Sequence, residues 1–219
     1  MTTRDNEPLS ALTHLVGAVF AIVGLVLLIV HGVRVGTTIH VVTFTIFGVS
    51  MFLLYLMSTL YHFVCKVLSP RARRVLQILD HSAVYFLIAG TYTPVTLIVL
   101  SPGWAWSLFG VIWGLTLIGT LIKTLQLPFP PWMSVLLYIL MGWLIVIASV
   151  PLAHTLYGAA IFWLVLGGMF YTIGAVFFAL DRVVPRTRWF GMHEIFHVFV
   201  MLGSFSHFWL LYHYLAYVH

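Results

Sequence analysis

Long apolar stretches recur along the whole chain, and they constrain its fold more than any other feature. Each reaches the roughly 20 mainly apolar residues that a helix needs to cross the hydrocarbon core of a bilayer. They run at about residues 12–32, 40–64, 75–100, 104–124, 131–151, 156–180 and 191–216. The sequence therefore predicts an all-α protein, a bundle of seven transmembrane helices that forms a single domain over residues 1–219.

Short segments rich in proline, glycine or charge separate these stretches, among them "SPGW" (101–104), "LPFPPW" (127–132) and "DRVVPRTRW" (181–189). Only 7% of the residues are charged, whereas globular domains carry about 25%. A soluble fold of this length has too few polar residues to cover so much apolar surface. We therefore expect an integral membrane protein. Because Cys65 is the single cysteine, the chain cannot form an internal disulfide. We interpret its N-terminus as a retained tail rather than a cleaved signal peptide.

Lysine and arginine are distributed unevenly between the two ends of the predicted spans. With the N-terminus inside, the inner side holds Arg4, Lys66, Arg71, Arg73, Arg74, Lys123, Arg182, Arg186 and Arg188. The outer side holds only Arg34, so the positive-inside rule predicts a cytoplasmic N-terminus and an external C-terminus. This orientation argues against a G-protein-coupled receptor, and the last span lacks the lysine that a retinal protein needs. Basic residues confined to short loops also predict no nucleic-acid partner.

Four ionisable residues fall at similar depth in the inner half of the predicted bundle. His62 lies near the inner end of the second span. At 1.5 Å per residue, Asp80 lies roughly 9 Å into the third span, and His193 and His197 lie roughly 8 and 14 Å into the last. Ionisable groups inside a membrane are costly and usually mark a functional site.

The spacing of these histidines suits a metal ion. His193 and His197 are separated by one helical turn and share a face, and His62 from another helix completes the three-histidine set typical of catalytic zinc. Ser58 lies one turn before His62 and would support the site by a hydrogen bond. Asp80 would accept a hydrogen bond, and then a proton, from the zinc-bound water. Paired histidines also arise by chance among 11 in the chain, and a buried imidazole can simply bond a backbone carbonyl.

The remaining histidines have simpler interpretations. Interfacial positions are expected for those at the outer ends of spans, which are His31, His40, His154, His213 and His219. His207 lies roughly 21 Å beyond His193 along the last span and cannot share its ion. His81 points about 100° away from Asp80 around the helix, and its role is open.

Several motifs occur together in a set order. They are "EPLSALTH" (7–14), "STLYH" (58–62), "LDHS" (79–82), "AGTYTP" (89–94), "HEIFH" (193–197) and "FSHF" (205–208). With seven spans and an inner N-terminus, this set resembles the PAQR superfamily (progestin and adipoQ receptors), specifically its bacterial haemolysin III branch. The resemblance covers nearly the whole chain.

The resemblance implies a zinc site near the cytoplasmic face, with His62, His193 and His197 as ligands and Asp80 and Ser58 around the bound water. It also implies kinship with alkaline ceramidases, and hence hydrolysis of a lipid amide or ester, with membrane lipids as partners. Other members serve membrane lipid homeostasis, and the expected location is the bacterial inner membrane. Glu7 and His14 fall within the first matched motif and are candidates either for supporting the metal site or for a structural role, of which the structural role is favoured.

Three other functions use the same features. A receptor or regulatory protein with structural zinc would need the same three histidines. A cytolytic pore former is disfavoured, because such proteins travel as soluble chains. An intramembrane metalloprotease would use Glu194 of the HExxH motif as general base, but its third ligand should be an aspartate in a later span. Here Asp80 precedes the motif, and the oligomeric state stays open.

Overall fold

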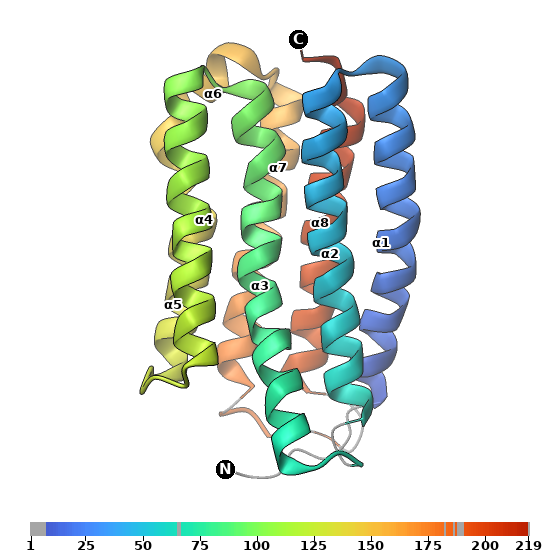
Figure 1. The fold of residues 1–219 in the computed structure, drawn as a ribbon, viewed down its shortest axis with the longest axis vertical. Coiled ribbons are helices and arrows are strands. Elements are labelled where there is room, and N and C mark those ends of the chain that lie inside the picture. The colour runs from blue at the N-terminus through green and yellow to red at the C-terminus, as the bar shows by residue number, and fades with distance from the viewer. Residues whose placement is uncertain (1–7, 65–66, 182, 186, 188–190, 219) are drawn as a thin grey trace.

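Helices and the short turns and loops between them make up the part of the chain that this computed structural model describes, residues 8–64, 67–181, 183–185, 187 and 191–218 (Figure 1). The helices are α1 (Pro8–Val35), α2 (Thr38–Val64), α3 (Pro70–Val99), α4 (Pro102–Thr124), α5 (Pro131–Trp143), α6 (Ser149–Thr155), α7 (Gly158–Leu180) and α8 (Met192–His213). Two short 3₁₀ segments, η1 (Leu144–Ala148) and η2 (Leu215–Tyr217), complete them. Within these ranges, seven helical segments are long and apolar enough to cross a membrane, which confirms the predicted spans.

Proline and serine set the start of the third span. Helix α3 begins at Pro70, five residues before the predicted start of the apolar stretch. The Ser69 hydroxyl accepts a hydrogen bond of 3.3 Å from the backbone N–H of Ala72, and Pro70 needs no partner at the first helical position. The hydropathy signal misses this extra turn because its arginines are polar.

The fifth span is broken, whereas the sequence predicts one continuous helix there. Pro151 lacks an N–H and crowds the carbonyl one turn earlier, which destabilises the α-helix just before it. The break is occupied by Tyr92 of α3, whose hydroxyl accepts from the Ile145 N–H at 2.7 Å and donates to the Met141 carbonyl at 2.7 Å. One hydroxyl thus bridges the backbone donor and acceptor that a regular helix would join directly.

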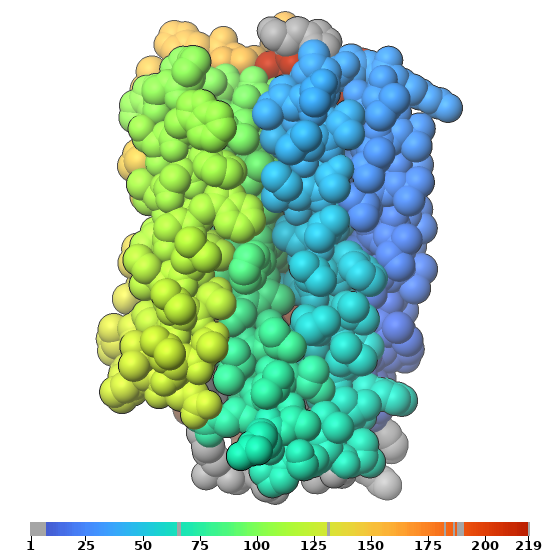
Figure 2. All heavy atoms as spheres, viewed as in Figure 1, coloured from blue at the N-terminus to red at the C-terminus, as the bar shows by residue number. Residues whose placement is uncertain are grey.

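The spans form a ring in which α1 packs against α2, α2 against α3, α3 against α4, α7 against α8, and α8 back against α1. Figure 2 shows side chains of α1 to α4 covering one long face of the bundle. Among these seven segments, α3 is the most enclosed, with 72% of its apolar stretch buried inside the bundle. Helix α7 is the least enclosed, with 11%. We call the end where α1 begins the lower end, as in Figure 1, and the opposite end the upper end.

Candidate metal centre

Three histidines from two helices meet near the lower end of the bundle. His62 comes from the last turn of α2, and His193 and His197 come from the first two turns of α8. The Nε2 atom of His193 lies 3.1 Å from Nε2 of His62 and 3.1 Å from Nε2 of His197. All three side chains are buried, and their ligand atoms lie within 4.8 Å of one another.

This donor set fits a tetrahedral ion. Zinc–nitrogen bonds of about 2.0–2.1 Å would place tetrahedral nitrogens roughly 3.3 Å apart, close to the observed 3.1 Å separations. Three converging imidazole nitrogens cannot all satisfy one another, because each neutral ring has a single N–H. The cluster could therefore hold a metal ion, as the spacing of the histidines predicts.

Backbone and hydroxyl groups of α1 orient His197. Its Nδ1 lies 3.2 Å from the Ser10 carbonyl and 3.3 Å from the Thr13 hydroxyl. Because a carbonyl only accepts, the bond to Ser10 places the proton on Nδ1 and leaves the Nε2 lone pair facing the other two histidines. The ring of His14 stacks on His197 with centroids 3.5 Å apart and planes 7° from parallel. The sequence marks His14 as a candidate for supporting the site, but it gives no sign of the contacts that Ser10 and Thr13 make with His197.

Asp181 is a second residue that sequence reasoning missed. It follows directly on α7, and its Oδ1 accepts a 3.2 Å hydrogen bond from the backbone N–H of His193. Its Oδ2 lies 3.9 Å from Nδ1 of the same histidine. This separation is too long for a hydrogen bond, but a carboxylate near the outer nitrogen of a histidine favours the proton on that nitrogen and raises the basicity of the other. The segment after residue 180 looks like a charged connecting loop, and this obscured the role of its first residue.

Glu194 is turned away from the three histidines. Its Oε1 accepts a 2.8 Å hydrogen bond from the Ser10 hydroxyl, and its Oε2 accepts one of 2.7 Å from the Gly191 N–H. The carboxylate therefore caps the start of α8 and joins it to α1. A general base of the HExxH type would have to face a metal-bound water, so this geometry gives no support to the metalloprotease reading.

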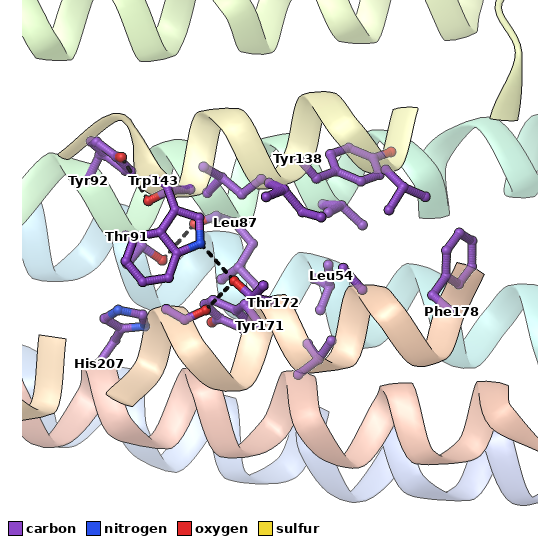
Figure 3. A pocket seen from close by; sticks show the side chains of 18 of the residues that line it. Leu54, Leu87, Thr91, Tyr92, Tyr138, Trp143, Tyr171, Thr172, Phe178 and His207 are labelled. Carbon is purple, nitrogen blue, oxygen red and sulfur yellow. Dashed lines mark hydrogen bonds between the residues drawn. The ribbon is translucent and has the colours of Figure 1, made fainter. Parts of the chain in front are cut away.

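A cavity of about 290 Å³ runs from His193 and His197 toward the upper end of the bundle. Two of the three histidines, His193 and His197, line this cavity. Ser58 and Asp80 line it as well. Leucine, valine, isoleucine and aromatic side chains from α3, α5 and α7 form much of the remaining wall, and Figure 3 shows part of it. The cavity has the character of a site for hydrocarbon with polar groups at defined points.

The other candidate residues are placed as follows. His14 and His81 also line the cavity, while His207 lines it near the upper end. His40 lies at the outer end of its span, where it is 1% exposed, and its Nε2 donates to the Leu215 carbonyl at 3.1 Å. A few candidates lie outside the described residues, namely Arg4, Glu7, Lys66, Arg182, Arg186, Arg188 and His219.

Comparison with known proteins gives relatives over most of the chain. The sequence matches the family described as haemolysin-III related over residues 2–208. Hemolysin-3 of Bacillus cereus is 43% identical over 199 residues, which cover 91% of this chain and 87% of that protein. A Hemolysin-3 homolog of Bacillus subtilis (strain 168) is 39% identical over 204 residues, covering 93% of this chain and 92% of the homolog. The human Monocyte to macrophage differentiation factor is 28% identical over 177 residues, covering 80% and 71%.

Proposed function

This chain belongs to the haemolysin-III related family of integral membrane proteins, and we propose that it is a zinc-dependent hydrolase of amide or ester bonds in membrane lipids. One observation carries the proposal. Two histidines of the triad, Asp80 and Ser58 line one largely apolar cavity that lies among membrane-spanning helices. A reactive lipid carbonyl could lie at its lower end while the acyl chain occupies the rest.

The three histidines favour zinc over the harder divalent ions. Neutral imidazoles suit zinc and later transition metals, whereas magnesium and calcium prefer oxygen ligands. When bound, zinc supplies a Lewis acid for the carbonyl and a water of lowered pKa. A three-histidine set leaves one coordination position open for that chemistry.

The remaining steps belong to the side chains on the cavity wall. The Asp80 carboxylate accepts the proton of the attacking water and returns it to the departing nitrogen or oxygen. The Ser58 hydroxyl, one turn before His62, donates a hydrogen bond that holds the water in place. Water adds to the carbonyl carbon, the carbon–nitrogen or carbon–oxygen bond breaks, and a fatty acid is left in the cavity.

We further propose that the N-terminus is cytoplasmic and the C-terminus external. Arg71, Arg73, Arg74 and Lys123 lie toward the lower end of the bundle, whereas Arg34 ends α1 at the upper end (Figure 1). The positive-inside rule then places the metal centre on the cytoplasmic side. Basic residues at that level would also attract anionic lipid heads.

The test is metal content and turnover on the same purified, detergent-solubilised protein. We expect about one zinc per chain in wild type, together with release of fatty acid from a fluorescent long-chain amide or ester. Asp80→Asn should keep the metal and lose roughly 10²–10⁴-fold in turnover. Zinc without turnover on either probe would contradict the hydrolase and favour a regulatory protein with structural zinc.

A further inference from the structure

Lys123 is a cation on the wall of the apolar cavity, and the proposed hydrolysis does not use it. It lies in the last turn of α4, at the lower end of the bundle. Among the described residues that line the cavity, it is the one lysine or arginine, and Asp80 is the one carboxylate. A charge among membrane-spanning helices is costly and usually marks a functional position.

The position of Lys123 on α4 places it on the face that looks into the bundle. Three buried residues precede it at spacings of three or four, namely Ile112, Thr116 and Gly119. Residues at these spacings share one face of a helix, so Lys123 continues the inward face of α4 rather than the lipid-facing one. Gly119 lets α4 approach α3 closely, since a Cβ atom there would lie 2.5 Å from Cζ of Tyr85.

Helix α5 contacts the ammonium group from the other side. Nζ of Lys123 donates a 2.6 Å hydrogen bond to the hydroxyl of Ser134, which is 5% exposed and lines the same cavity. A lysine at a helix end can bend its flexible stem outward to water, whereas this bond keeps the charge beside the cavity. One turn further along α5, Tyr138 donates to the His81 carbonyl at 3.0 Å. In Figure 3 Tyr138 lies at the end of the cavity away from His207, which is the lower end.

We infer that Lys123 and Ser134 form a subsite for a phosphate group on the head of a lipid bound in this cavity. The inference rests on the proposed function in one respect, since it places the acyl carbonyl of that lipid at the metal centre. Helix α3 packs against both α2, which carries His62, and α4, which carries Lys123. The phosphate would therefore lie several bonds from the carbonyl, across the lower end of the cavity.

The charge of Lys123 favours phosphate over a neutral head group. A phosphate monoester carries about −1.5 to −2 charges at pH 7, and hydrogen bonds between ionised groups are the strong ones. An ammonium has three N–H donors, so it can bind a phosphate oxygen while it keeps its bond to Ser134. The largely apolar remainder of the wall suits the acyl chain. The substrate class is therefore a lipid amide or ester whose head group carries a phosphate.

Binding of two ether lipids tests the subsite without requiring turnover. The probes are hexadecyl glyceryl ether and its phosphate monoester, neither of which has an amide or carboxylic ester to cleave. Each displaces radiolabelled hexadecyl glyceryl ether from the purified metal-loaded protein in a nonionic detergent at low salt. Wild type should prefer the phosphorylated ether, and Lys123→Gln should reduce that preference roughly tenfold. Lys123→Arg keeps the charge and should keep most of the preference.

Arg71→Gln provides the matched control. Arg71 is exposed near the start of α3, at the same end of the bundle, and its loss should leave the preference unchanged. An equal loss in Arg71→Gln would mean that surface charge attracts the phosphate. Equal preference in wild type and Lys123→Gln would mean that the phosphate binds elsewhere, for example on the metal. Either result overturns the subsite.

Two further readings separate the subsite from simpler roles. Equally weakened binding of both ethers to Lys123→Gln would mean that the lysine only joins α4 to α5, and would overturn the subsite. Inorganic phosphate should displace neither ether, and displacement by it would assign the site to free phosphate instead of a lipid. Since binding and metal content are measured apart from the release of fatty acid, failure of the hydrolase proposal would be seen separately.

Discussion

The two ends of the cavity use histidine in opposite ways. At the lower end, imidazoles from α2 and α8 converge. The Ser10 carbonyl of α1 and the carboxylate of Asp181, which directly follows α7, contact two of these histidines from outside the cluster. At the upper end, the ring of His207 packs against Tyr171 and Gly167 of α7. The same side chain on the same helix thus forms part of a candidate metal site in one place and a ring packed against Tyr171 and Gly167 in the other. Neighbouring helices decide which.

The largest expected effect separates the two ends by metal content. His193→Ala removes the residue whose Nε2 lies 3.1 Å from both of the others, so bound zinc should fall from about one per chain to near zero. His207→Ala should leave the metal in place. Mass spectrometry of the purified proteins measures both, with far-UV circular dichroism to check that each is folded. Loss of zinc in both variants, or in neither, would remove the distinction between the two ends.

Asp181 sharpens the account of the lower end. Asp181→Asn replaces the carboxylate beside His193 by a neutral amide. We expect zinc affinity to fall by about 10–100-fold, the usual cost of losing a carboxylate next to a metal-binding histidine. Competition with a chelator of known affinity measures the change. Asp181→Glu keeps the charge and should recover part of the loss. An unchanged affinity in Asp181→Asn would mean that this aspartate only caps the start of α8.

Glu194 tests whether the lower end also depends on its tie to α1. Glu194→Gln keeps an oxygen that can accept from the Gly191 N–H but faces the Ser10 hydroxyl with a donor, so both hydrogen bonds lose their charge. The change should cost about 1–2 kcal/mol and lower the melting temperature by a few degrees. Ser10→Ala removes the hydroxyl of the same pair, so the double variant should cost less than the sum of the two. Turnover that vanishes in Glu194→Gln while zinc and stability are retained would instead make Glu194 the general base, the role that the HExxH motif predicts for it.

The smallest effect is expected at the upper end. Trp143→Phe removes one hydrogen bond between helices, to Thr172, and such bonds in membranes are worth about 0.6 kcal/mol. The melting temperature should therefore drop by roughly 1–2 °C. Trp106→Phe is the matched control, because Trp106 is 63% exposed on α4 and should leave the melting temperature unchanged. A drop as large as that of Glu194→Gln would show that the upper end is as tightly coupled as the lower.

Hydropathy and helical spacing predict the spans and the His193–His197 pair because both are local properties, whereas His62 is added from its similar depth in the bundle. A span needs only its own apolar length, and His193 and His197 share a face in any α-helix. The supporting contacts depend on tertiary packing instead. Ser10 and Glu194 are 184 residues apart in the sequence, and nothing near either one signals the other. The break in the fifth span, between α5 and α6, was missed for a related reason, since Tyr92 of α3 stabilises it from another helix.

The separation of the three histidines along the chain has a consequence for biosynthesis. His62 and His193 are 131 residues apart, and a ribosome adding about 5–20 residues per second needs roughly 7–26 s to cover that interval. During this time α2 is already made while α8 does not yet exist. The triad forms only when the last helix enters the bundle, so a stalled or truncated chain has no complete site. Only chains that include α8 can therefore bind a metal ion at the proposed three-histidine site.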